Sequence, residues 1–273
     1  MLPREIIQTY IIDAKIPVVH CVEFLGIPGS GKTTLQNKLL QSHQKRHTLS
    51  TASELAYLYK TSSLWSSVLT NIPLISEYTA IKVISLLFGN KCDEYALDNF
   101  HRDTTAYAGI IDAEIRRIST SDEQYELLNY WFNRMAARHM LSSQVLPSDR
   151  PVLIDEGFVQ RTISIFCSTD PNVDLNPDTL QAYLKSIPKP DDLIIVDTPT
   201  NVAKNRLNQR TQGWPNRCEG LDKQTRDLFL ERTAHCVTSV EETLREETTI
   251  RTHTVDGTEN VEQITEKLEK IIF

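Results

Sequence analysis

The chain has 273 residues, of which 40% are hydrophobic and 24% are charged, and its formal net charge at pH 7 is −7. This length and composition are typical of a folded globular protein that can bury a large core. The acidic balance argues against a general basic surface for nucleic acid, but it leaves room for a local groove that binds small anions.

The cysteines and the apolar runs indicate the compartment. The five cysteines are scattered and none forms a C-x-x-C pair, so the sequence predicts neither a zinc site nor a disulfide framework. Arg4, Glu5 and Asp13 interrupt the N-terminal stretch, and no uncharged apolar run approaches the length of a membrane span. We therefore expect reduced thiols, no membrane partner and a cytoplasmic location.

A glycine-rich motif separates the first two predicted elements. The apolar run 16–25 predicts a buried strand, and residues 32–45 predict an amphipathic helix. Residues 26–34 lie across this junction and read Gly-Ile-Pro-Gly-Ser-Gly-Lys-Thr-Thr, which completes the pattern G-x-x-x-x-G-K-[ST]. Glycines allow several backbone N–H groups to approach phosphate oxygens together, so the motif in this context predicts a nucleoside triphosphate site.

The residue types in this loop have separate predicted roles. Lys32 adds a positive charge near the β- and γ-phosphates, and Thr33 supplies a hydroxyl group to magnesium. The positive N-terminal end of the helix faces the phosphates. The loop residues expected to bind the nucleotide are Gly26, Pro28, Gly29, Ser30, Gly31, Lys32, Thr33 and Thr34.

The middle of the chain is mainly helical in pattern. After a short strand at 47–51, apolar residues recur at helical spacing over 53–87, and two longer helices are predicted at 98–118 and 121–145. Ser121 is followed three residues later by Gln124, as in a capping box. We expect one domain over 1–273, with a core of 16–50 and 98–273 and a helical insertion at about 53–97.

The last part of the chain alternates between strands and helices. Strands are predicted at 152–154, 193–196 and 250–255, and helices at 178–186, 199–210, 222–247 and 260–271. The strands are apolar on both faces, which is typical of a parallel sheet covered by helices on both sides. The predicted fold class is therefore α/β.

Two carboxylates follow the strand at 152–154. Asp155 stands where a parallel sheet presents its C-terminal edge to a ligand, so it is expected either to organise magnesium or to cap the helix that begins near Phe158. Glu156 could activate water, as in an ATPase, handle a phosphoryl acceptor, as in a kinase, or be solvated.

Arginines near the end of the helix at 199–210 suggest a lid. Arg206 and Arg210 are four residues apart and share a helix face, and the loop 209–217 that follows carries Arg217. Guanidinium groups brought over a γ-phosphate would neutralise developing charge, whereas the alternative is that all three are solvated surface groups.

Three further residues are candidates for binding the acceptor. Arg134 and Arg138 form another pair four residues apart and could hold an anionic acceptor, or they could lie on an exposed helix face. Glu54 could reach an acceptor hydroxyl, or it could belong to a helix start after Ser53. The histidines show no ligand spacing, and we expect structural roles for them.

The order of these motifs resembles the nucleoside and nucleotide kinases of the P-loop superfamily, with thymidylate kinase the nearest relative. The similar segments are 26–34, the strand-proline-helix run 196–210, and the loop 255–260. The resemblance implies the P-loop NTPase fold, in which helices flank a parallel sheet, with ATP and Mg²⁺ as cofactors. It also implies that Gly257 and Thr258 pack against adenine, and weakly that Arg134 contacts an acceptor phosphate.

The chain differs from that family in the acceptor region. Thymidylate kinases carry Asp-Arg-Tyr where this chain has Asp155, Glu156 and Gly157, and Arg-Glu-Pro where it has Ser53 and Glu54. Replacing arginine by glutamate reverses a charge in the acceptor pocket. The resemblance therefore carries over the fold and the phosphoryl donor, but it does not identify the acceptor.

Two functions remain open from the sequence. The first is a kinase that transfers the γ-phosphoryl group of ATP to a nucleotide, a nucleoside or a similar small acceptor. The second is a P-loop ATPase or nucleotide-dependent switch that acts through a protein or nucleic-acid partner; the order of Asp155 and Glu156 favours it. The sequence leaves open whether the chain forms a homodimer.

Overall fold

A computed structural model describes residues 20–44, 50–51, 108–145, 151–154, 156–211, 213–246 and 249–273. Within helix α7 the side chains from residue 137 onward lie outside this description, as do those of residues 43–44, 50–51 and 108. The predicted helical insertion at about 53–97 and the candidates Glu54 and Asp155 fall outside the described residues, and for Arg138 only the backbone is described.

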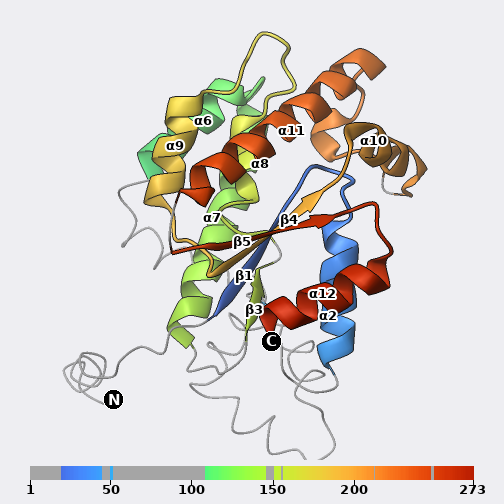
Figure 1. Cartoon of the computed structure of the whole chain (residues 1–273). Coiled ribbons are helices and arrows are strands. Elements are labelled where there is room, and N and C mark those ends of the chain that lie inside the picture. Colours follow the sequence, from blue (N-terminus) through green and yellow to red (C-terminus); the bar gives the residue numbers. More distant parts are fainter. Residues whose placement is uncertain are drawn as a thin grey trace, which may run out of the picture.

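Five parallel strands form one sheet in the described part of the chain (Figure 1). The strands are β1 (Cys21–Leu25), β2 (Ser50–Thr51), β3 (Val152–Ile154), β4 (Asp192–Asp197) and β5 (Arg251–Asp256). Their spatial order is β2-β3-β1-β4-β5, so β1 is central and the next strand along the chain lies two positions away. This crossover places the carboxyl ends of β3, β1 and β4 side by side, where ligands bind in open parallel sheets.

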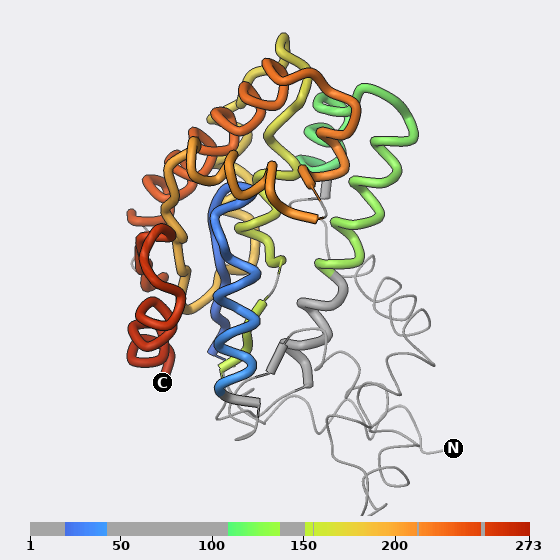
Figure 2. The backbone as a smooth tube through the Cα atoms, turned by 90° about the vertical axis from the view of Figure 1, so that its right-hand side faces the viewer, coloured from blue at the N-terminus to red at the C-terminus, as the bar shows by residue number. Residues whose placement is uncertain are grey.

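Helices cover both faces of the sheet (Figures 1 and 2). The described helices are α2 (Lys32–Gln44), α6 (Ala108–Ile118), α7 (Asp122–Val145), α8 (Arg161–Phe166), α9 (Pro177–Ser186), α10 (Thr200–Gln209), η1 (Asn216–Cys218), α11 (Lys223–Arg245) and α12 (Val261–Ile272). In Figure 2, α2 in blue and α12 in red lie together on one side, and the α6–α7 hairpin in green lies on the other.

Alternate residues of the strands enter two separate cores. On β1, Val22 and Phe24 pack with α2 and α12, whereas Leu25 packs with α6 to α9 and α11. On β4, Ile194 joins the first core and Ile195 joins the second. Strands β1, β3 and β4 are therefore buried on both faces, as their apolar sequences predict. The prediction is wrong for the edge strand β5, on which Val255 is the one buried residue.

The predicted boundaries agree with the observed ones to within a few residues for most elements. The strand at 152–154 is confirmed at both ends, while β1 begins at Cys21 within the predicted run and α6 begins at Ala108. The backbone N–H of Gln124 donates to Ser121 Oγ at 3.2 Å, which confirms half of the predicted capping box. The return contact differs, because Gln124 Oε1 accepts from Thr120 instead.

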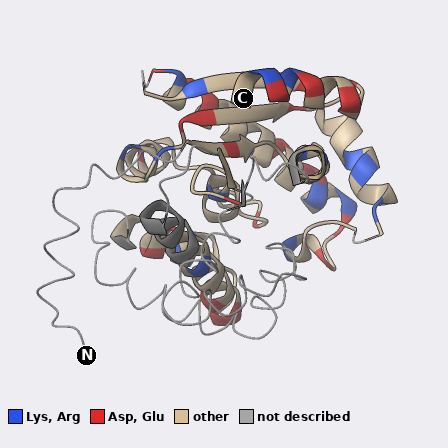
Figure 3. Ribbon diagram, turned by 90° about the horizontal axis from the view of Figure 1, so that it is seen from below, with Lys and Arg blue, Asp and Glu red and all other residues tan. Residues whose placement is uncertain are grey.

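Neither the surface charges nor the helix lengths point to a particular partner. Basic and acidic residues are interspersed over the described ribbon (Figure 3). Among the helices in the described ranges, none is both long enough and apolar enough to span a membrane.

Candidate functional site: a phosphate loop and the pocket above it

The segment between β1 and α2 folds into a tight loop. Gly29 and Gly31 have φ values of 81° and 102°, a backbone region that L side chains rarely adopt. At Gly29 an added Cβ would also lie 2.5 Å from the carbonyl oxygen of Ala203 on α10. The loop therefore requires glycine here, both for the backbone turn and for close contact with the neighbouring helix.

Lys32, the first residue of α2, lies back against the loop. Its Nζ donates to the carbonyl oxygens of Gly26 at 2.5 Å and Ile27 at 3.0 Å, and to Ser30 Oγ at 3.3 Å. Burial lowers the pKa of Lys32 to about 8, and the nearby negative charge of Glu156 opposes this shift. The ammonium group is therefore held by the loop that it would help to close around a phosphate.

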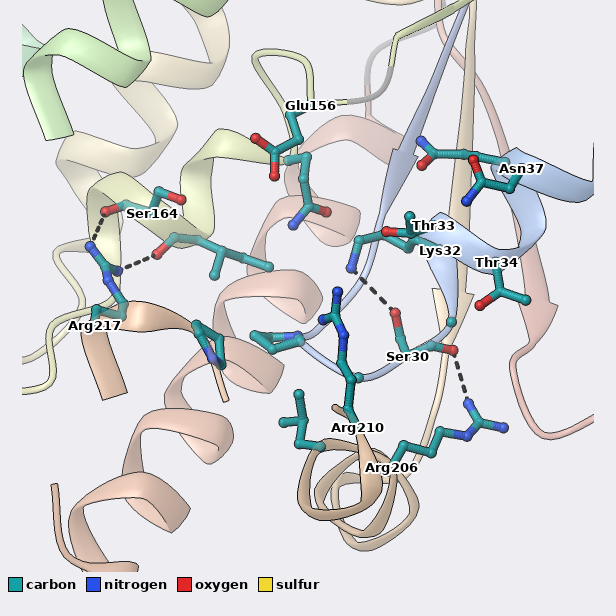
Figure 4. Close-up of a pocket in the computed structure, with 18 of the residues that line it drawn as sticks. Ser30, Lys32, Thr33, Thr34, Asn37, Glu156, Ser164, Arg206, Arg210 and Arg217 are labelled. Carbon is teal, nitrogen blue, oxygen red and sulfur yellow. Dashed lines mark hydrogen bonds between the residues drawn. The ribbon is translucent and has the colours of Figure 1, made fainter. Parts of the chain in front are cut away.

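A cavity of about 620 Å³ opens above this loop (Figure 4). It extends from the phosphate loop and α2 to the β3–α8 turn, α8, α10, η1 and the first turns of α11. Its described lining is Pro28, Gly29, Ser30, Gly31, Lys32, Thr33, Thr34, Gln36, Asn37, Glu156, Gln160, Ile163, Ser164, Arg206, Leu207, Arg210, Pro215, Arg217 and Phe229. The cavity thus brings together most of the loop residues and all three predicted lid arginines.

Arg206 braces the phosphate loop. Its guanidinium donates to the carbonyl oxygen of Ser30 at 3.1 Å and to that of Gly257 at 2.8 Å. These bonds join the loop to the turn after β5. In Figure 4 the side chain is directed toward Ser30 and away from the labelled residues of the opposite wall.

Arg217 is fastened to the end of α8. Its guanidinium donates to the carbonyl oxygens of Cys167 and Ser164, both at 2.9 Å, and of Ile163 at 3.4 Å. Carbonyls at a helix C-terminus lack intrahelical donors, and Arg217 supplies donors to those of Ser164 and Cys167, while the Ile163 carbonyl also accepts from the Cys167 N–H. The predicted lid segment is thus anchored at this point in the structure.

Arg210, at the C-terminal end of α10, lies between the other two arginines. Its side chain is exposed and lines the cavity, and Figure 4 shows it directed toward Lys32. Of the three predicted arginines it is the one placed to meet a ligand on the phosphate loop.

Glu156 forms an ion pair with Arg161 at the opposite wall. The Glu156 carboxylate accepts from Arg161 Nη2, and its side chain is 57% exposed. Glu156 lines the cavity, whereas Arg161 is not among its described lining residues.

The turn after β5 is bonded to the end of β4. The Gly257 N–H donates to the Asp197 carbonyl at 2.6 Å, and Thr258 is exposed, with its N–H bonded to Asp256 Oδ1 at 2.8 Å. Gly257 and Thr258 are absent from the described lining of the cavity. Their predicted contact with a base stays a prediction.

Arg134 lies apart from the cavity in the described structure. Its guanidinium is over the rings of Trp131 and Tyr130, with centroid distances of 5.5 and 5.9 Å, and Nη1 donates to the Tyr130 hydroxyl at 3.1 Å. The described residues that line the cavity do not include Arg134. Its predicted role, like those of Arg138, Glu54 and Asp155, stays a prediction.

Glu23 and Gln160 are two residues of the site that no sequence motif indicates. Glu23 lies within the run that predicts an apolar strand, but its carboxylate accepts from the Gln160 N–H at 2.7 Å and the residue is 1% exposed. The Gln160 side chain in turn accepts from the Gly26 N–H at 3.1 Å. The available signal was a charged residue inside a strand that is buried on both faces.

The loop residues fit a bound phosphate chain, whereas the described residues supply few ligands for a metal. The positive-φ glycines, Lys32 and the start of α2 form an anion cradle of the kind that the motif requires. Thr33 is exposed in the cavity and could bind Mg²⁺. The described residues contain no group of three or more His, Cys, Asp or Glu placed to hold a metal, and Asp155 is outside them.

The parallel sheet, its strand order and the loop between β1 and α2 together define a P-loop NTPase fold. No family model matches the chain, and no curated protein matches it.

Solved structures of two kinases are similar to the chain. A thymidylate kinase from Candida albicans has 15% identity over 93% of this chain and 91% of that chain, with a TM-score of 0.46. A deoxyadenosine kinase from M. mycoides, with the products dCMP and dCDP, has 13% identity over 92% and 97%, with a TM-score of 0.40. Neither similarity is close enough to assign a function.

Proposed function

We propose that the protein is a phosphotransferase that moves the γ-phosphoryl group of ATP, with Mg²⁺, to a nucleotide, a nucleoside or a similar small acceptor. The observation that carries the proposal is the single cavity that joins the phosphate loop to Arg210 and to the wall of Glu156, Gln160 and Ser164. A volume of about 620 Å³ is in the range of small-molecule sites.

The residues divide into three roles in this proposal. Lys32 and the loop amides bind the β- and γ-phosphates, and Thr33 together with Asp155 would hold Mg²⁺, which neutralises charge on the phosphates when bound. Arg210 stabilises the transferring group, because its side chain points toward Lys32 (Figure 4). Arg206 and Arg217 shape the site through their bonds to backbone carbonyls.

The ion pair of Glu156 supports a kinase over an ATPase. A glutamate that activates water needs its carboxylate available to accept a proton from that water. One oxygen of the Glu156 carboxylate already accepts a hydrogen bond from Arg161 Nη2, so that oxygen is engaged within the protein.

The test is ADP release from Mg-ATP by the purified protein with a panel of nucleosides, nucleoside monophosphates, 5′-hydroxyl oligonucleotides and simple sugars. Lys32→Ala is the blank, and mass spectrometry detects the phosphorylated product. We expect one acceptor class to raise turnover and to gain a phosphoryl group. Turnover that depends on Lys32 but is flat across the panel would favour the ATPase or switch, and transfer that survives Lys32→Ala would refute the proposed site.

A further inference from the structure

Glu23 is a carboxylate buried in the central strand, where an apolar side chain would cost less. The residue is 1% exposed, and Glu23 pairs in register with Ile154 of β3, next to the turn that leads into α8. Removing a carboxyl group from water is unfavourable unless hydrogen bonds compensate for the loss. Such a group in a strand centre therefore calls for an explanation beyond core packing.

The carboxylate organises the turn that begins after β3. It accepts from the backbone N–H of Gln160 at 2.7 Å and from that of Val159. Burial raises the pKa of Glu23 to about 8, while these two hydrogen bonds and the charge of Arg161 oppose the shift. In either protonation state the carboxyl keeps an oxygen that can accept from the turn.

Gly157 makes room for this carboxylate. A Cβ at position 157 would lie 2.4–2.6 Å from the three carboxyl atoms of Glu23, closer than real Cβ contacts come. Gly157 is not among the described glycines with positive φ, so alanine would meet the carboxylate rather than a strained backbone. The glycine in the Asp-Glu-Gly sequence is thus explained by Glu23.

The same turn holds the first residue of the phosphate loop. Gln160 Oε1 accepts from the Gly26 N–H at 3.1 Å, and the Gly26 carbonyl accepts from Lys32 Nζ at 2.5 Å. Glu23 is therefore connected to Lys32 through the turn, the Gln160 side chain and Gly26. Removal of the Glu23 carboxylate would therefore leave the turn less well positioned, and the phosphate loop with it.

We propose that Glu23 is a positioning residue for nucleotide binding, which acts by fixing the 157–160 turn so that Gln160 holds Gly26 and the phosphate loop in register. This inference rests on the ATP-binding part of the proposed function. It assigns Glu23 no contact with the substrate.

The test compares the ATP dissociation constant and the melting temperature of matched variants. Glu23→Met keeps the approximate length but removes both acceptors, and we expect it to weaken ATP binding by about tenfold, as the loss of a buried hydrogen bond allows. Glu23→Gln retains one acceptor oxygen and should bind within about threefold of wild type. Glu114→Met is the control, since Glu114 is also buried, at 3% exposed, and pairs with Arg117 on α6.

Gly157→Ala provides an independent variant. It should weaken ATP binding as Glu23→Met does, whereas in the Glu23→Ala background, where the carboxylate is gone, adding Gly157→Ala should cause little further loss. If Glu23→Met fails to fold, Gln160→Met tests the contact with Gly26, because Gln160 is only half-buried.

The outcomes separate the two proposals. ATP binding by Glu23→Met within about twofold of wild type, a matching loss in Glu114→Met, or unchanged binding by Gln160→Met would each overturn the role of Glu23. A wild-type protein that binds no ATP would overturn both proposals. ATP binding without any transfer to the acceptor panel would overturn the transferase alone.

Discussion

Arg206 gives the sharpest contrast between a structural and a chemical role. Its two bonds, at 3.1 Å to Ser30 and 2.8 Å to Gly257, tie the phosphate loop to the turn after β5. Each bond from a half-buried guanidinium to a carbonyl contributes about 1 kcal/mol once solvent screening is allowed for. Arg206→Met, which removes both, should therefore lower the free energy of unfolding by about 2 kcal/mol, or the melting temperature by about 4–8 °C.

The assay is thermal unfolding followed by circular dichroism, with ATP binding and turnover measured on the same samples. Lys204→Met is the matched control on α10, since Lys204 pairs with Asp227 at a partly exposed site and should contribute less than about 1 kcal/mol. Arg210→Met is the functional counterpart, with a melting temperature near wild type and a turnover that falls far more than ATP affinity. An unchanged melting temperature in Arg206→Met together with lost turnover would refute the bracing role and support direct stabilisation of the transferred group.

Three further predictions concern the loop and the sheet. With the pKa of Lys32 near 8, ATP affinity should be level below pH 8 and should fall by up to about tenfold per pH unit above it. Proton uptake on binding should then be detectable by calorimetry in buffers of different ionisation enthalpy. Constant ATP affinity from pH 7 to 9.5 would contradict this. Gly29→Ala should lose ATP binding and at least about 1 kcal/mol of stability, because its Cβ would meet the Ala203 carbonyl at a positive φ, whereas normal binding would show that the loop can shift. Burial opposes ionisation of Asp192, but its hydrogen bonds, including those from Arg251, hold the pKa of its carboxyl well below the usual range. The ionised carboxyl therefore stabilises the fold fully above about pH 4, and this stabilisation decreases as the pH falls toward the folded-state pKa. Asp192→Asn should cost about 3 kcal/mol in urea unfolding at pH 7, with a smaller difference from wild type at pH 3, and an equal difference at both pH values would refute the assignment.

The phosphate loop and most of the secondary structure could be predicted because their signals are local. The loop is a run of consecutive residues whose glycines, lysine and threonine have fixed relative positions. The apolar strands 152–154 and 193–196 and the helix that Asn260 caps were readable from patterns a few residues long. The sequence thus determined the α/β class and the position of the anion cradle.

Only the tertiary structure decided what each charged side chain contacts. The four-residue spacing predicted that Arg206 and Arg210 share a helix face, but α10 ends at Gln209 and the backbone of Arg210 is extended. Spacing also could not show that Arg206 reaches carbonyls of two separate loops. Arg217 looked like part of a mobile lid, yet its donors meet the end of α8, about fifty residues earlier in the chain. Such partners are set by how distant segments pack.

Glu23 shows the same limit most clearly. In sequence it is one polar residue in a strand, and its partners Gly157 and Gln160 lie more than 130 residues away. A local sequence pattern cannot predict that these positions are in contact, because the contact exists only after β1 and β3 pair in parallel register. The sequence by itself determined that a phosphate-binding loop follows the first strand, and the folded sheet decided which residues hold that loop in place.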